Sequence, residues 1–90
     1  MNRLRRFACC LLLGASASWA ASRVAVDVGH TLADPGATSA RGRSEFAFNR
    51  DLAGVLAEHL GRRGIVVQEI NFAGDIGSLP ERATRAAGSD

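Results

Sequence analysis

The sequence predicts an α/β fold, in which strand, loop, helix, strand, loop and helix form the start of a mostly parallel sheet flanked by helices. Val24, Val26 and Val28 alternate with other residues in the period-two pattern of a strand, and a second β-branched run follows at 65–70. An apolar stripe of helical period lies between them, from residue 45 onward. A strand–helix–strand crossover makes the two strands parallel. Because two strands do not complete a sheet, we expect a truncated domain.

Residues 1–20 have the organisation of a secretory signal peptide. Arginines cluster within residues 1–6, an uncharged stretch runs from Phe7 to Ala17, and small residues follow, with Ser18 and Ala20 suited to a cleavage site after Ala20. Cleavage after Ala17 is the second choice. A transmembrane anchor would need about 20 apolar residues, more than this stretch supplies. We therefore expect export to the periplasm or the medium, with no stable membrane anchor after cleavage.

The charge balance changes once the predicted signal is removed. The chain has 90 residues, 11 basic residues and 9 acidic ones, for a net charge of +2, and all of the basic residues are arginine. Three arginines and both cysteines belong to residues 1–20, so residues 21–90 are slightly acidic and have no cysteine. This composition argues against a nucleic-acid partner, and it excludes disulfides and thiolate chemistry from the exported part.

The segment 29–44 is a long loop, rich in Gly, Ala, Thr and Ser, with a turn at Asp34-Pro35-Gly36. Loops of this length usually carry function. Ser44 is a suitable N-cap for a helix that begins at Glu45 and ends at Gly61 or Gly64. The expected buried face of this helix is the stripe of Phe48, Leu52, Val55, Leu56, His59 and Leu60.

The second half repeats the pattern of strand, loop and helix. Residues 65–70 form the second strand, and residues 71–77 form the loop after it. Ser78 and Glu81 are spaced as a capping box, Pro80 fits the first helical turn, and the helix should run to about Ala87.

Two side chains that can bind a metal are expected at one edge of the sheet. His30 follows the first strand, at the carboxyl edge where ligands bind in open α/β sheets. Glu45 opens the first helix, and the loop is long enough to bring the two together. An imidazole and a carboxylate are two of the three protein ligands of a catalytic zinc site. The spacing alone is also compatible with a loop histidine and a glutamate that complements the helix dipole.

Several motifs of the chain occur in the order and spacing of one known family. They are the strand Val24-Ala-Val-Asp-Val-Gly-His30, then Asp34-Pro-Gly-Ala37, Gly42, Glu45 and Asn49, then Leu52, Leu56 and Leu60, and finally Ser78-Leu79-x-x-Arg82-x-x-x-Ala86. Together they resemble the start of the zinc-dependent N-acetylmuramoyl-L-alanine amidase family, over essentially all of residues 24–90. Three positions depart from the family pattern: Val28 replaces a proline, Thr31 a glycine and Ala87 an asparagine.

The resemblance implies a function and a cofactor. The family hydrolyses the amide between N-acetylmuramic acid and L-alanine in peptidoglycan, in cell-wall remodelling or daughter-cell separation, with one Zn²⁺. It implies that His30 and Glu45 are the first two zinc ligands. The family's third ligand, a histidine, and its general base, a glutamate, match no residue of this chain and are expected beyond residue 90. We therefore expect residues 21–90 to be the N-terminal part of the catalytic domain, inactive alone.

Other charged and aromatic residues have simpler interpretations. His59 lies about 20 Å along the helix from Glu45, too far to share its metal. We expect Arg82 and Arg85 to be solvated or paired with Glu81, with a substrate groove as the alternative. Phe46, Phe48 and Phe72 are expected in or beside the core.

Two alternatives to an amidase stay open on the sequence. The exported segment is compatible with a non-catalytic module that binds peptidoglycan and retains His30 and Glu45 as vestiges. It is also compatible with a fragment that does not fold stably, because its sheet would leave a strand edge exposed.

Overall fold

The computed structural model describes residues 21–88, which contain two strands and two helices. In chain order these are β1 (Arg23–Asp27), α2 (Glu45–Arg62), β2 (Val66–Ile70) and α3 (Leu79–Ala86). β1 and β2 pair in parallel, with Arg23 opposite Val66 and Asp27 opposite Ile70. The predicted α/β class, element order and parallel pairing are therefore confirmed. The predicted signal peptide lies outside the described residues.

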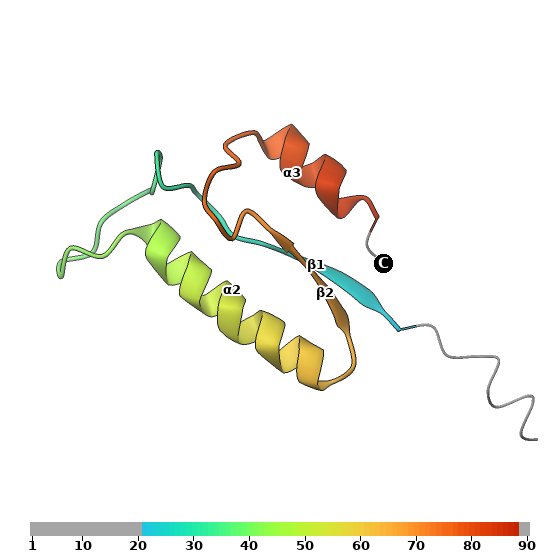
Figure 1. The fold of residues 1–90 in the computed structure, drawn as a ribbon. Coiled ribbons are helices and arrows are strands. Elements are labelled where there is room, and N and C mark those ends of the chain that lie inside the picture. The colour runs from blue at the N-terminus through green and yellow to red at the C-terminus, as the bar shows by residue number, and fades with distance from the viewer. Residues whose placement is uncertain (1–20, 89–90) are drawn as a thin grey trace, which may run out of the picture.

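The two helices lie on opposite faces of the strand pair, as Figure 1 shows. On the α2 face, Val26 and Val28 pack with Phe46 and Ala53 to form the buried cluster. Partly buried residues of both strands, of α2 and of the loop after β2 surround this cluster; they are Val24, Leu60, Val67 and Phe72. The alternating valines of the sequence therefore lie on one face of β1, and this face packs against α2.

The face of α2 that packs against the sheet differs from the predicted one. The buried contacts of α2 come from Phe46, Ala53 and the partly buried Leu60, which recur every two helical turns. Most of the predicted stripe is instead 46–69% exposed; the residues are Phe48, Leu52, Val55 and Leu56. The prediction that Phe48 belongs to the core is wrong, whereas Phe46 and Phe72 do pack there. The reason is geometric, because two strands are too narrow to cover a broad helix face.

The helix ends follow the predicted capping chemistry. The Ser44 hydroxyl accepts a hydrogen bond from the Ala47 N–H at 3.2 Å, and the Ser78 hydroxyl accepts one from the Glu81 N–H at 3.2 Å. After α2, Gly64 adopts a positive φ of 77°, and the Ile65 N–H reaches back to the Leu60 carbonyl at 3.1 Å. The second helix ends at Ala86, one residue before the predicted end.

Across residues 21–88, neither helix combines the length and apolarity that crossing a membrane requires.

Candidate functional site

The candidate site lies where the chain leaves β1. Val28 is fully buried, and two residues later His30 adopts a left-handed backbone conformation with φ of 67°. For a residue other than glycine this conformation costs about 1–2 kcal/mol. It turns the chain sharply out of the strand direction and starts the long loop that leads to α2.

The loop is fastened both to α2 and to the segment after β2. The Leu32 N–H donates to the Gly74 carbonyl at 2.9 Å, across the sheet edge. Farther along, the Phe46 N–H donates to the Pro35 carbonyl at 3.0 Å, and the Glu45 N–H donates to the Ala37 carbonyl at 2.9 Å. These bonds return the loop to the first turn of α2, as the sequence predicted.

His30 and Glu45 meet as a consequence. Nε2 of His30 lies 2.8 Å from Oε2 of Glu45, and the two side chains are 38% and 49% exposed. The other carboxylate oxygen of Glu45, Oε1, accepts the Ala37 N–H at 3.0 Å. One oxygen therefore holds the carboxylate in place while the other faces the imidazole. The expected proximity of these two residues is confirmed.

Gly36 allows the imidazole to occupy this position. Its φ is 77°, and a Cβ at this residue would lie 2.9 Å from both Cε1 and Nε2 of His30. It would also lie 3.1 Å from Cβ of Glu45. Glycine is thus required here for two separate reasons, the backbone conformation and the space that the imidazole fills.

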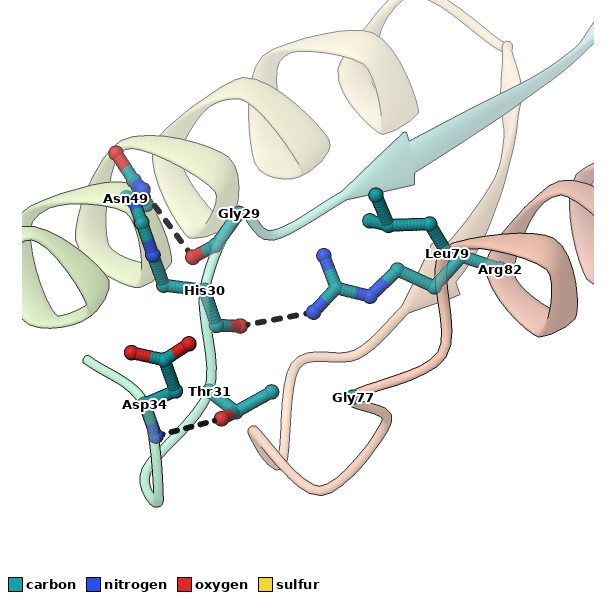
Figure 2. Close-up of a pocket in the computed structure, with 8 residues that line it drawn as sticks. All are labelled: Gly29, His30, Thr31, Asp34, Asn49, Gly77, Leu79 and Arg82. Atoms are coloured by element: carbon teal, nitrogen blue, oxygen red, sulfur yellow. Dashed lines mark hydrogen bonds between the residues drawn. The ribbon is translucent and has the colours of Figure 1, made fainter. Parts of the chain in front are cut away.

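A pocket of about 460 Å³ opens beside the imidazole, and Figure 2 shows the residues that line it. One side is formed by Asn49, one turn into α2 from Glu45, whose Nδ2 donates to the Gly29 carbonyl at 3.1 Å. The other side includes Leu79 and Arg82 of α3. The pocket therefore lies between the N-terminal ends of the two helices, with His30 in its wall.

Arg82 is not the solvated or Glu81-paired residue that the sequence predicted. Its side chain is 6% exposed, and Nε donates to the Ile76 carbonyl at 2.8 Å. Nη1 donates to the Val28 carbonyl at 3.2 Å, and Nη2 donates to the His30 carbonyl at 3.0 Å. Arg85, on the exposed side of the same helix, does pair with Glu81 at 2.9 Å. The pattern of α3 allowed either arginine to face inward, and packing on the sheet edge selects Arg82.

Asn71 is a residue that the sequence reasoning missed. It follows β2 with φ of 60°, it is 4% exposed, and its Nδ2 donates to the carbonyls of Val28 at 2.6 Å and His30 at 2.7 Å. Its position in the sequence could have indicated this role, because asparagine tolerates the left-handed conformation and Asn71 directly follows a strand.

The remaining histidine lies away from this pair, whereas Asp34 lines the same pocket as His30. His59 lies in the last turn of α2, far from Glu45 as predicted, but it is exposed although it belongs to the stripe that was expected to be buried. Within residues 21–88, no group of three or more His, Cys, Asp or Glu side chains is arranged to hold a metal ion. The described site therefore offers two donor side chains, His30 and Glu45.

Comparison with known proteins gives no relative for this chain: no family model, no curated protein and no solved structure matches it.

Proposed function

We propose that this chain is the N-terminal part of an exported, zinc-dependent N-acetylmuramoyl-L-alanine amidase that acts on peptidoglycan. The proposal rests on the sequence motifs described above. The observation that carries it is the 2.8 Å approach of His30 Nε2 to Glu45 Oε2, the two residues that match the family's first zinc ligands. Residues from opposite ends of a long loop meet at the carboxyl edge of a parallel strand pair, the place where α/β folds bind ligands.

The two side chains fit a zinc ion in chemistry and in arrangement. Imidazole nitrogen and carboxylate oxygen are common zinc ligands, and in a tetrahedral site with bonds of about 2.0–2.2 Å two such atoms lie about 3.4 Å apart. The observed 2.8 Å is shorter, so a small rotation of either side chain would admit the ion. The hydrogen bond from Ala37 to Oε1 would keep the carboxylate oriented during that rotation.

Each residue of the site then has a separate task. His30 and Glu45 would hold the zinc, which supplies Lewis-acid polarisation of a carbonyl and acidification of a water molecule. Asn49 fixes the Gly29 carbonyl, and with it the turn that presents His30. The pocket beside His30 is large enough for part of a stem peptide or an amino sugar.

Two ligands are fewer than the three that catalytic zinc sites use. The proposal therefore assigns catalysis to a longer polypeptide that includes these residues and supplies a further histidine ligand and a glutamate base. The 90-residue chain alone should bind zinc weakly and should release no stem peptides from purified sacculi. The coding sequence after codon 90 should continue in frame into an apolar strand that contains a histidine.

The test combines zinc titration with a sacculus assay. Calorimetric zinc binding to the chain should be lost in His30→Ala and in Glu45→Ala. It should be unchanged in His59→Ala, which removes an exposed histidine at the opposite end of α2. In the longer polypeptide, the first two substitutions should abolish release of stem peptides. A near-normal rate in either variant would remove that residue from the zinc site.

The same assay addresses the alternative of a non-catalytic module. Such a module would sediment with insoluble peptidoglycan in the presence of a chelator, and His30→Ala would bind as well as wild type.

A further inference from the structure

The left-handed backbone of His30 needs a structural cause. Residues in this conformation persist where their surroundings hold them, and the carbonyl of His30 is the group held here. It accepts hydrogen bonds from Nδ2 of Asn71 at 2.7 Å and from Nη2 of Arg82 at 3.0 Å. Figure 2 shows the Arg82 guanidinium reaching this carbonyl from the far side of the pocket.

The carbonyl of Val28, two residues earlier, is held in the same way. It accepts from Nδ2 of Asn71 at 2.6 Å and from Nη1 of Arg82 at 3.2 Å. The same two side chains therefore bracket the turn at Gly29 from both ends. A rotation of the His30 peptide would remove an acceptor from both donors at once.

Asn71 and Arg82 are themselves fixed by a single peptide segment. Oδ1 of Asn71 accepts the Ile76 N–H at 3.0 Å, and Nε of Arg82 donates to the Ile76 carbonyl at 2.8 Å. We call Asn71, Ile76 and Arg82 the carbonyl clamp. Its parts come from the end of β2, the following loop and α3, and all three residues are buried.

The charge of Arg82 gives the clamp its strength. The one carboxylate within ion-pair distance of it among residues 21–88 is that of Asp27, 3.8 Å from Nη1 and 41% exposed. Backbone carbonyls are therefore the main partners of a buried cation. If His30 turned to an extended conformation, the backbone strain would be relieved, but Arg82 would be left as a buried charged donor without its acceptor. The free-energy cost of that lost hydrogen bond is larger than the strain relieved.

We propose that Arg82 and Asn71 are positioning residues that hold the His30 backbone left-handed and thereby keep its imidazole against Gly36 and Glu45. Neither side chain hydrogen-bonds the imidazole itself; both act through the main chain of His30. The consequence for metal binding rests on the proposed function, whereas the consequence for the orientation of His30 does not.

The deciding measurement is made on the metal-free full chain by NMR. The imidazole Cε1 faces Gly36 so closely that a nuclear Overhauser contact between His30 Hε1 and Gly36 Hα reports its position. The contact between Val24 and Val67, which are paired across the two strands, reports the rest of the fold. Arg82→Met should lose the first contact and keep the second. The matched control is Arg85→Met, an exposed arginine one turn along the same helix, which should keep both.

Two milder variants decide the matter if Arg82→Met does not fold. Arg82→Lys keeps the charge but donates from a single nitrogen, which cannot span the three carbonyls that Nε, Nη1 and Nη2 of Arg82 reach. Asn71→Gly removes the amide at a residue whose positive φ glycine adopts readily. Both should weaken the His30–Gly36 contact. Survival of that contact at wild-type intensity in the folded variants would overturn the proposal. So would loss of the Val24–Val67 contact in all three variants, because the clamp would then support the whole fold.

A zinc titration separates this inference from the proposed function. If His30 and Glu45 bind zinc, Arg82→Lys should weaken the affinity by about tenfold to a hundredfold, as loss of an outer support does. If wild type binds no zinc but the NMR contact depends on Arg82, the proposed function fails and the positioning role stands. If zinc binds and the contact does not depend on Arg82, the positioning role fails alone.

Discussion

Oε2 of Glu45 lies 2.8 Å from Nε2 of His30, while Oε1 of the same carboxylate accepts the Ala37 N–H at 3.0 Å. The pairing of histidine and glutamate is therefore a property of the loop as well as of the two side chains. Ala37 in turn accepts the Glu45 N–H through its own carbonyl, so the loop end and the helix start are joined by two hydrogen bonds. Changes in the loop should consequently affect the pair even where they leave both side chains intact.

Gly36→Ala should displace the imidazole of His30 from Glu45. Gly42→Ala is the matched control, because Gly42 has nearly the same φ of 79° but no atom within 4 Å of an added Cβ. Both substitutions should cost about 1–2 kcal/mol of unfolding free energy for the left-handed backbone. Only Gly36→Ala should also change the NMR shifts of the His30 ring and weaken zinc binding. If the NMR shifts of the His30 ring were the same in Gly36→Ala and Gly42→Ala, the position of the imidazole would not depend on Gly36.

Glu45→Gln should separate the structural role of Glu45 from metal binding. A glutamine oxygen can still accept the Ala37 N–H, so the unfolding free energy in urea should fall by no more than about 0.5 kcal/mol. Glu45→Ala loses that acceptor and should cost about 1 kcal/mol more. If the chain binds zinc as proposed, the zinc affinity should fall at least about tenfold in both variants, since each lacks the proposed carboxylate ligand. Zinc binding by Glu45→Gln at wild-type strength would contradict the ligand assignment.

Phe46 and Phe48 should differ strongly in their contribution to stability. Phe46 is 1% exposed in the buried cluster, whereas Phe48 is 49% exposed beneath the guanidinium of Arg43, which lies 4.2 Å from the ring centroid. Phe46→Ala should cost about 3–5 kcal/mol, enough to unfold a domain of this size. Phe48→Ala should cost about 1 kcal/mol or less, the strength of an exposed cation–π contact. Thermal melts followed by circular dichroism measure both, and similar losses would show that α2 packs through its other face.

Gly74→Ala should be one of the most damaging small substitutions in the second loop. An added Cβ there would lie 2.5 Å from Cζ of Phe46, a contact that the buried ring can relieve only by moving. Overpacking of this kind costs about 1–3 kcal/mol beyond the left-handed penalty. Gly64→Ala carries the same penalty at φ of 77° with open space around it. In urea denaturation, the unfolding free energy of Gly74→Ala should therefore be clearly lower than that of Gly64→Ala. Equal unfolding free energies would contradict the close approach of residue 74 to the Phe46 ring.

The local sequence predicted most of the secondary structure because local chemistry decides it. The alternating valines, the serines before each helix and Gly64 after α2 act within a few residues of one another, through side-chain alternation, capping and a permitted positive φ. The approach of His30 to Glu45 was also predictable, since a strand end and a helix start joined by one loop lie at the same edge of the sheet.

The direction in which α2 faces was not predictable in the same way. Both Phe46 and Phe48 are apolar, and helical periodicity places an apolar stripe without saying what will cover it. The width of the sheet decides this, and the sheet comes from residues on either side of the helix. The exposed stripe of Phe48, Leu52, Val55 and Leu56 is the result.

Local sequence patterns predict the α/β order of elements, the helix caps and the approach of His30 to Glu45 at one edge of the sheet. Tertiary packing is what buries Arg82 and leaves Arg85 exposed, and it brings Asn71 and Arg82 together on the carbonyls of Val28 and His30. The two cases differ in the range of the interactions. Capping and alternation act between near neighbours in the chain, whereas a backbone carbonyl accepts a hydrogen bond from whichever donor the fold brings to it.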